Sequence, residues 1–255
     1  MGRAARAYAA GVRPFLLLST RADDAAADGE LEAIARFGGL DPEREIRRMR
    51  LEAGPLPPLD LDDWSGVIVG GSPFNASDAT HEKSSVQRRV EGELHGLLDE
   101  IVARDHPFLG ACYGVGTLGV HQGGVIDRTY GEPVGTVPVT LTEAGRADPV
   151  FAGLPPTFEA FVGHKEAVRV PPPGAVVLAS SPGCPVQAFR VRRNLYATQF
   201  HPELDAPGMV ARVEIYRHAG YFPPEELGQV IDRVSGVVVD APPRVLTAFV
   251  ERYAR

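Results

Sequence analysis

The stretch HPFLGACYGVG, residues 106–116, sets a cysteine between two glycines directly after a short apolar run. The apolar pair before the first glycine is typical of the end of a buried strand. Because Gly110 and Gly114 let the backbone reverse without steric clash, we expect Cys112 in a tight turn that leads into a helix from about Val115. In hydrolases with the pattern G-x-S-x-G, such a turn presents the nucleophile. The alternative is a buried structural cysteine, which is common in proteins.

Apolar runs alternate with helical patterns on both sides of this stretch. Strands are expected at residues 14–19, 45–52, 66–71 and 107–112, and helices at residues 28–39, 84–105 and 115–121. This order predicts an α/β fold with a doubly wound, mostly parallel sheet flanked by helices. Short strand-like runs between proline and glycine turns predict an antiparallel extension over residues 134–200. Helical patterns follow at about 208–220, 224–234 and 242–254.

Composition restricts the function classes. The 255 residues are 44% hydrophobic and 23% charged, which suits a globular protein with a sizeable core. We interpret residues 1–255 as a single domain, with a core at about 14–205 and a helical extension at 206–255. A formal net charge of −7 argues against a nucleic-acid partner. Only two cysteines occur, so no disulfide framework is expected and a reducing compartment is favoured.

The beginning of the chain shows no targeting signal. Residues 1–13 contain three arginines and lack the apolar segment of a secretion signal, so we expect a frayed or helical tail. The apolar run FLLL that follows is too short to cross a membrane. We therefore expect a soluble, cytoplasmic protein without membrane contact.

A second motif, HPE, follows an apolar run near residue 200. His201 and Glu203 are two residues apart, so their side chains point to the same face of an extended backbone, which Pro202 helps to maintain. A carboxylate beside an imidazole fixes its tautomer and favours its protonated form. An imidazolium beside a cysteine favours the nucleophilic thiolate. An isolated HPE is more often a loop cap, but sheet topology places this one near Cys112.

A nucleophile that attacks a carbonyl carbon needs hydrogen-bond donors for the oxyanion. The backbone N–H of Tyr113, directly after the cysteine, is one candidate. Gly71, which ends the run VIVGG, is the other, because a residue without a side chain lets the backbone approach the substrate. A simple turn at Gly70 and Gly71 is the alternative interpretation.

Three segments together carry a resemblance to a known family. GACYG (110–114), ATQFHPE (197–203) and IVGGSP (68–73) resemble motifs of the class I glutamine amidotransferases, especially the amidotransferase domain of GMP synthase and its stand-alone relatives. The resemblance implies the flavodoxin-like fold of that family and a Cys-His-Glu triad of Cys112, His201 and Glu203. The implied reaction hydrolyses the side-chain amide of glutamine through a γ-glutamyl thioester and releases ammonia. It involves no cofactor and no metal.

Further pocket residues follow from the same resemblance. VGHKEAV (162–168) is similar to a family segment beside the site, which implies that His164 and Glu166, with Gly70, help to build the substrate pocket. The alternative for the first two is a polar surface turn. Gly116 departs from the family pattern, which has a glutamine there. We expect this glycine to leave an opening beside the nucleophile, to weaken glutamine binding and to admit a bulkier γ-glutamyl amide.

Three functions remain open. The first is a glutamine amidotransferase; since the 50 or so residues after HPE are too few for an ATP-using domain, use of the ammonia requires a synthetase partner chain. The second is a γ-glutamyl peptidase or hydrolase that acts without a partner. The third, of another class, is a catalytically silent binding or regulatory subunit that retains the fold.

Overall fold

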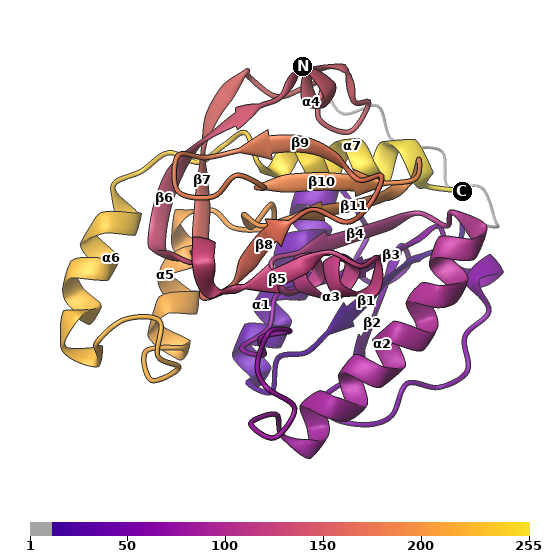
Figure 1. Cartoon of the computed structure of the whole chain (residues 1–255), viewed down its shortest axis with the longest axis horizontal. Helices are drawn as coiled ribbons and strands as arrows, with labels where there is room; N and C mark the ends of the chain where they lie inside the picture. The colour runs from indigo at the N-terminus through magenta and orange to yellow at the C-terminus, as the bar shows by residue number, and fades with distance from the viewer. Residues whose placement is uncertain (1–11) are drawn as a thin grey trace.

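A nine-stranded mixed sheet runs through the computed structural model, which describes residues 12–255 (Figure 1). Its strands, in the order of the sheet, are β2 (Ile46–Arg50), β1 (Phe15–Ser19), β3 (Gly66–Val69), β4 (Phe108–Ala111), β11 (Leu195–Thr198), β10 (Ala188–Val191), β9 (Val176–Ser180), β6 (Glu132–Leu141) and β7 (Thr157–His164). A separate pair is formed by β5 (Val125–Asp127) and β8 (Ala167–Val170).

The sheet has a parallel half and an antiparallel half. The strands from β2 to β11 pair in parallel, and the order 2-1-3-4 of the first four is that of flavodoxin-like sheets. The strands from β11 to β7 pair antiparallel. Both features of the predicted fold class are confirmed. Strand β11 belongs to the stretch 134–200 but is parallel to β4, so β3, β4 and β11 all end at one edge.

Helices cover the sheet on both faces. They are α1 (Asp24–Gly38), α2 (Ser85–Arg104), α3 (Tyr113–His121), α4 (Glu143–Ala147), α5 (Ala206–Ile215), α6 (Leu227–Ser235) and α7 (Pro243–Tyr253), with short 3-10 turns at Leu61–Asp63, Arg128–Tyr130 and Pro224–Glu226.

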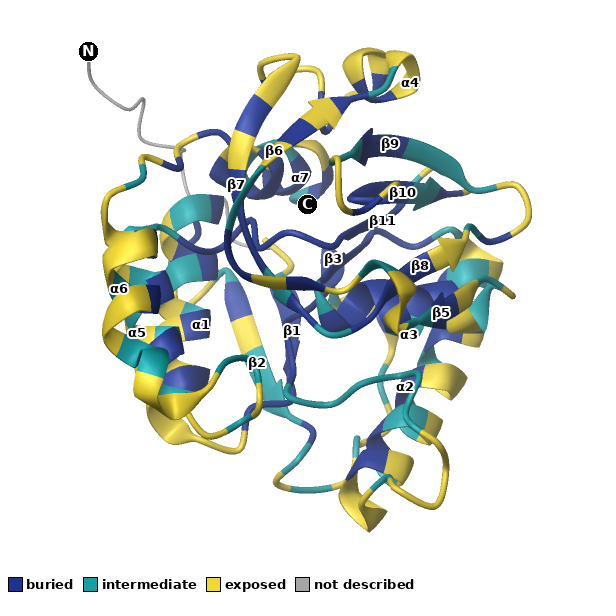
Figure 2. Cartoon of the chain, turned by 60° about the vertical axis from the view of Figure 1, so that its left-hand side comes forward, coloured by how far each residue is buried: buried dark blue, intermediate teal, exposed yellow. Residues whose placement is uncertain are grey.

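Alternate side chains of β1 define the two layers. Phe15 and Leu17 pack with residues of α1 and α7, whereas Leu16 and Leu18 pack with residues of α2 and α3. Figure 2 shows the central strands as buried along their length and the outer faces of the helices as exposed. The run FLLL is therefore apolar throughout because both faces of the strand are covered.

The helical extension divides into two parts. Helix α7 packs against α1 and completes the core on that side of the sheet. Helices α5 and α6 pack on β6 and β7, around Val134 and Phe161, at the left of Figure 1. The extension therefore covers the carboxyl edge of the sheet with α5 and supports the core with α7.

Helices α1 and α3 begin earlier than expected. Helix α1 starts at Asp24 instead of residue 28, because Asp23 caps it by accepting a hydrogen bond from the N–H of Ala26 at 2.9 Å. Helix α3 starts at Tyr113, directly after the cysteine, instead of near Val115. The expected tail at residues 1–13 lies almost entirely outside the described residues. Within residues 12–255, no helix combines the length and apolarity that crossing a bilayer requires.

Candidate active site

Cys112 occupies a strained turn between β4 and α3. Its backbone has φ 53° and ψ −91°, a combination that non-glycine residues rarely adopt. Its N–H donates to the carbonyl of Thr198 on β11 at 2.8 Å, which ties the turn to the neighbouring strand. A Cβ on Gly110 would lie 2.8 Å from the backbone of Gly114, so glycine is required at 110 for the turn to close. The turn predicted from residues 106–116 is therefore present, and the strain of Cys112 marks it as a candidate functional residue.

His201 and Glu203 follow β11 at the same edge of the sheet. Glu203 Oε1 lies 2.7 Å from His201 Nδ1, and both residues are buried. The N–H of His201 donates to the carbonyl of Phe161 on β7 at 3.0 Å, which fixes the backbone of the motif. The predicted contact between the carboxylate and the ring is thus formed, and it leaves His201 Nε2 free to act on a neighbouring group.

The electrostatics of the pair favour a charged imidazole. Burial alone lowers the pKa of His201, but attraction to Glu203 and to the sulfur of Cys112 outweighs it, and the pKa is raised. Burial raises the pKa of Glu203, yet His201 and, more weakly, Arg212 and Arg21 lower it below its ordinary value. At neutral pH the arrangement therefore supports an imidazolium held between a carboxylate and a sulfur.

Tyr113 and Gly71, the residues expected to supply oxyanion donors, lie next to Cys112 and His201 respectively. Tyr113 is the first residue of α3, where a backbone N–H has no partner within the helix. A Cβ on Gly71 would lie 2.6 Å from Arg21 Nη2 and 3.0 Å from His201 Cε1, so the close approach there requires glycine. Gly70 has a different role from the one expected, because a Cβ there would lie 2.5 Å from the carboxylate of Glu30. It makes room for a buried ion pair rather than for substrate.

His164 and Glu166 are buried, which excludes a polar surface turn. His164 Nε2 lies 2.9 Å from Glu132 Oε2, and His164 Nδ1 lies 2.9 Å from the carbonyl of Glu166. The Glu166 carboxylate accepts hydrogen bonds from the N–H groups of Ala76 and Ser77 at 2.8 and 2.7 Å. Glu166 therefore holds the loop after Gly71 in place, and His164 contacts the backbone of Glu166. Neither residue lines the pocket that contains Cys112.

The expected opening at Gly116 is absent. A Cβ at this position would lie 2.9 Å from Glu166 Oε1 and 3.0 Å from the Cβ of Ala76. Both contacts are tighter than ordinary packing allows, and the Glu166 carboxylate that fills the space is held by two backbone N–H groups. The sequence-based expectation of a side-chain-sized gap is therefore wrong, and Gly116 does not line the pocket beside Cys112.

The second cysteine has no comparable setting. Cys184 is fully buried, and its thiol contacts the carbonyl of Val186 at 3.5 Å. Burial raises the pKa of this thiol to about 12, so it stays protonated at neutral pH. Of the two cysteines, only Cys112 reaches a pocket with a histidine.

Sequence reasoning missed part of the pocket wall. Besides Cys112 and His201, the polar residues that line the pocket come from the loop after β1, the loop after β3 and the helical extension: Arg21, Ser72, Arg212, Tyr216 and Tyr221. Leu204, Met209, Val213 and Phe222 supply much of the apolar wall. No local motif marks these residues, because they lie up to 200 positions apart in the chain.

Four contacts fasten the extension over the pocket. Arg21 Nη1 donates to the hydroxyl of Tyr216 at 3.2 Å. Lys165 Nζ donates to the carbonyl of Ala219 at 2.7 Å and lies 4.6 Å from the centre of the Tyr221 ring. The Tyr221 hydroxyl lies 3.5 Å from the carbonyl of Ser72. The wall after α5 is therefore anchored to segments on both sides of the nucleophile turn.

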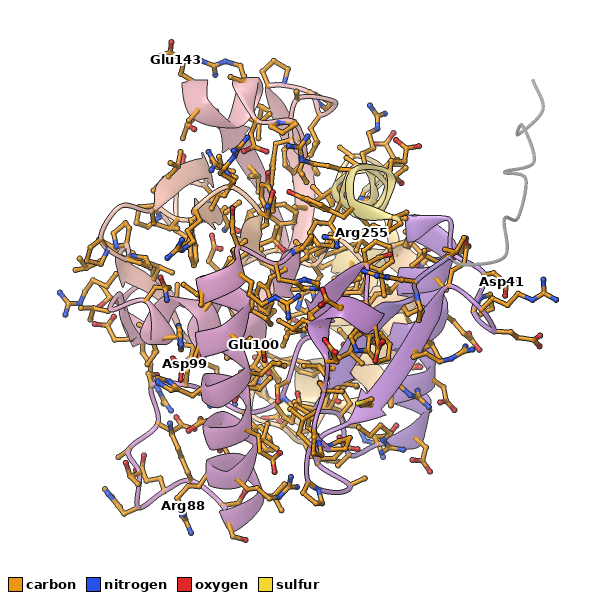
Figure 3. All side chains as sticks on the ribbon, turned by 90° about the vertical axis from the view of Figure 1, so that its right-hand side faces the viewer. Asp41, Arg88, Asp99, Glu100, Glu143 and Arg255 are labelled. Carbon is orange, nitrogen blue, oxygen red and sulfur yellow. The ribbon has the colours of Figure 1, made fainter. Side chains whose placement is uncertain are left out.

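One group within the described chain has metal-ligand geometry. His95 and Asp99 on α2 and His121 at the end of α3 place three ligand atoms within 4.8 Å of one another. Figure 3 labels Asp99 on the outer side of α2. This group lies at the opposite end of α3 from Cys112, so it is not part of the candidate site.

A doubly wound sheet with a nucleophile-type turn and a His-Glu pair at its carboxyl edge defines a class of α/β proteins with hydrolase-like sites. Comparison with protein families identifies the particular group. Residues 49–208 match the model described as Glutamine amidotransferase class-I, and the chain belongs to this family.

Individual relatives agree with this membership. The chain is 31% identical over 179 residues to the glutamine-hydrolyzing GMP synthase of Carboxydothermus hydrogenoformans. The matched stretch covers 66% of this chain and 32% of that protein. The chain thus spans about a third of the length of that curated relative. Among solved structures, a glutamine amidotransferase from Thermotoga maritima has a TM-score of 0.71 at 22% identity and covers 94% of this chain and 98% of its own. One from Methylobacillus flagellatus has a TM-score of 0.68 at 19% identity, covering 95% and 94%.

Proposed function

We propose that the chain hydrolyses the side-chain amide of glutamine, or a related γ-glutamyl amide, with Cys112 as nucleophile, His201 as acid and base, and Glu203 as the carboxylate that orients His201. The observation that carries the proposal is the 2.7 Å contact between His201 Nδ1 and Glu203 Oε1 beside a cysteine in a strained strand-to-helix turn. Family membership supports the same reaction type.

The first half of the reaction forms a thioester. The Cys112 thiolate attacks the amide carbon, and the carbonyl oxygen becomes an oxyanion that the N–H groups of Tyr113 and Gly71 stabilise. When the C–N bond breaks, the His201 imidazolium donates its proton to the departing nitrogen. The product that leaves is ammonia from glutamine, or an amine from a substituted amide.

The second half regenerates the enzyme. Neutral His201 takes a proton from water, and the resulting hydroxide attacks the thioester carbon. The C–S bond breaks, glutamate leaves, and the Cys112 thiolate pairs again with protonated His201. Glu203 keeps its charge throughout and holds Nδ1 in the donor state, which leaves Nε2 for the proton transfers.

A second candidate is γ-glutamyl hydrolysis without a synthetase partner. Residues of α5 and of the segment after it, including Arg212 and Tyr221, already form one wall of the pocket that contains Cys112. This wall favours a site that is complete within one chain. A synthetase partner that uses the ammonia remains a proposal supported by the resemblance to GMP synthases. A silent subunit is disfavoured by the strained cysteine and the His-Glu contact.

The purified chain incubated with glutamine and with a panel of γ-glutamyl amides tests the proposal. We expect release of glutamate that requires Cys112 and His201, measured as glutamate, ammonia and free amine. Cys112→Ala and His201→Asn are the test variants, and Cys184→Ala is the matched control that retains activity. Equal activity in Cys112→Ala and the unmodified chain would contradict the proposal, as would no release from any substrate.

A further inference from the structure

Two arginines line the Cys112 pocket. Arg21 comes from the loop between β1 and α1, and Arg212 comes from α5 in the extension. Only 3% of Arg21 and 12% of the Arg212 side chain are exposed. Charged side chains are rarely buried to this degree unless they are paired, so the partners of both cations need to be accounted for.

Arg21 is paired and held in a fixed position. Its Nε donates to Glu30 Oε1 at 2.7 Å, and its Nη1 donates to the hydroxyl of Tyr216 at 3.2 Å. The remaining nitrogen, Nη2, lies beside Gly71, where a Cβ would come within 2.6 Å of it. One face of this guanidinium therefore points to the place where the oxyanion donor and His201 meet.

Arg212 is not paired in the same way. Its Nη1 is shielded from solvent and has no hydrogen-bond partner among residues 12–255. The nearest carboxylate oxygen in an ion-pair contact with it is Glu30 Oε1, at 4.0 Å, beyond hydrogen-bond distance. Both oxygens of Glu30 are already engaged, Oε1 by Arg21 and Oε2 by the hydroxyl of Ser19 at 2.8 Å. A buried donor without a partner is costly, and a water molecule or the polar group of a ligand beside Arg212 can satisfy it.

Electrostatics support the same conclusion. Burial lowers the pKa of Arg212, and the charge of Arg21 lowers it further, against the opposing effects of Glu30 and Glu203. An anion in the pocket offsets both effects, because its negative charge favours the charged form of Arg212. Since apolar Leu204, Met209 and Val213 line the same pocket, such a pair is weakly screened.

We propose that Arg212, with Arg21, forms a carboxylate-binding subsite in the pocket that contains Cys112, and that the substrate is a γ-glutamyl compound whose free carboxylate binds there. This substrate class rests on the proposed function. Residues 21 and 212 lie outside the segment 49–208 that matches the family model, so the subsite is built by the flanking segments. A guanidinium binds a carboxylate through two parallel N–H donors, which fixes the orientation of the substrate.

The carboxylate has two possible sources in such a substrate. One is the α-carboxylate of the γ-glutamyl half, and the other is a carboxylate on the departing amine. Three chromogenic anilides separate them: 4-aminobutanoyl 4-nitroanilide has neither carboxylate, γ-glutamyl 4-nitroanilide has the first, and γ-glutamyl 3-carboxy-4-nitroanilide has both. Their kcat/KM values are measured with the full chain, Arg212→Gln, Arg212→Lys and the exposed control Arg217→Gln.

We expect Arg212→Gln to lower kcat/KM by about tenfold to a hundredfold for the substrate whose carboxylate binds, the usual loss for a charged hydrogen bond. For the matched anilide without that carboxylate, kcat/KM is the same in Arg212→Gln and in the unmodified chain. Arg212→Lys recovers part of the lost kcat/KM, and Arg217→Gln has the kcat/KM of the unmodified chain. An equal loss on all three anilides shows instead that Arg212 positions Glu203, and it overturns the subsite. No loss on any of them also overturns it.

A binding measurement separates this inference from the proposed function. Titration calorimetry with glutamate, the product, requires no turnover and is done with Cys112→Ala and with Cys112→Ala/Arg212→Gln. We expect binding in the first and a loss of about tenfold or more in the second. If no anilide is hydrolysed but glutamate binds through Arg212, the proposed function fails and the subsite stands. If glutamate binding is absent or indifferent to Arg212, the α-carboxylate is not the group that binds, and the subsite is wrong unless Arg212→Gln lowers kcat/KM for γ-glutamyl 3-carboxy-4-nitroanilide alone.

Discussion

At the scale of single residues, the backbone of Cys112 links the fold to the chemistry. A positive φ at a residue with a side chain costs roughly 1–3 kcal/mol, and the surrounding structure has to supply that energy. The hydrogen bond from the Cys112 N–H to Thr198 supports the strained backbone, and glycine at 110 avoids a clash with Gly114 that would prevent the turn. The turn places Cys112 in a pocket that His201 also lines.

Gly116 carries the first prediction. Gly116→Gln displaces the Glu166 carboxylate and frees the two N–H groups that it holds, because a Cβ there lies 2.9 Å from Glu166 Oε1. We expect a loss of about 1–3 kcal/mol in the free energy of unfolding, as for other overpacked sites, and no decrease of KM for glutamine. Urea denaturation and steady-state kinetics measure both.

Gly92→Gln is the control for this substitution, because a Cβ at Gly92 meets nothing within 4 Å. It lies on the exposed side of α2, where glutamine favours the helix more than glycine does. Unchanged stability of Gly116→Gln together with tighter glutamine binding would contradict this account. It would show that a side-chain-sized opening exists beside Gly116, as the sequence analysis expected.

His106 carries a prediction on pH. Burial, with smaller contributions from Arg255 and Arg104, lowers its pKa from 6.5 to about 4, and its buried Nε2 has no partner among the described residues. Between pH 6.5 and 4, His106 binds a proton in the unfolded chain but stays neutral in the folded chain. The free energy of unfolding therefore decreases as the pH falls through this window, by up to about 1.4 kcal/mol per pH unit from this residue.

The comparison of His106→Gln with the unmodified chain isolates this contribution, because other titrating groups are common to both. Urea denaturation at several pH values from 8 to 4 should show a shallower decrease for His106→Gln. The exposed His81→Gln variant serves as the control and keeps the full decrease. Parallel curves for all three proteins would contradict a buried, neutral His106.

Sequence reasoning found the residues that act within short segments. The cysteine turn and the HPE pair depend on residues no more than four positions apart, so their geometry is set locally. Arg212 and the contents of the space at Gly116 depend on tertiary packing. The sequence around Arg212 is typical of a surface helix, so it does not predict that this arginine is buried in the pocket wall. Glu166 lies 50 positions from Gly116, so no local pattern predicts that its carboxylate fills the space beside this glycine.

At the scale of elements, α5 connects the extension to the site. Asp205 caps this helix by accepting a hydrogen bond from the N–H of Gly208 at 2.9 Å, and it pairs with Arg36 on α1 at 2.7 Å. The helix begins three residues after Glu203 and carries Arg212 into the pocket wall. Its position thus decides where the second guanidinium lies relative to the sheet edge.

Asp205→Ala tests this connection. We expect a loss of about 1 kcal/mol in the free energy of unfolding, the usual effect of removing an N-cap acceptor, and weaker binding of glutamate because α5 holds Arg212 less firmly. Asp205→Asn is the control, since asparagine caps helices as well as aspartate does. If Asp205→Ala and Asp205→Asn weaken binding equally, the charge of Asp205 and not the cap is responsible.

Elements with strong periodicity were predictable, and their ends were less so. Helix α2 is expected at 84–105 and observed at Ser85–Arg104, because Val90, Leu94 and Leu98 repeat at helical spacing. Helix α1 begins four residues early because its first turn is rich in alanine, which carries little amphipathic signal. Capping by Asp23 marks the true start.

At the scale of the whole molecule, the sheet brings distant segments to one edge. Strands β3, β4 and β11 end there side by side, and they deliver Gly71, Cys112 and His201 although these residues lie far apart in the chain. The extension then covers this edge and adds Arg212. The parallel topology of the sheet therefore brings the candidate catalytic residues together, and the helical extension at 206–255 supplies much of the pocket wall.

Covalent trapping of the whole chain tests the central claim, that Cys112 is the nucleophile, most directly. The purified protein is treated with a chloroketone analogue of glutamine, and the adduct is located by intact mass and peptide mass spectrometry. We predict one adduct, on Cys112, which glutamine slows and which Cys112→Ala abolishes, while buried Cys184 stays unmodified. Labelling at Cys184, or an adduct that persists in Cys112→Ala, would contradict the account.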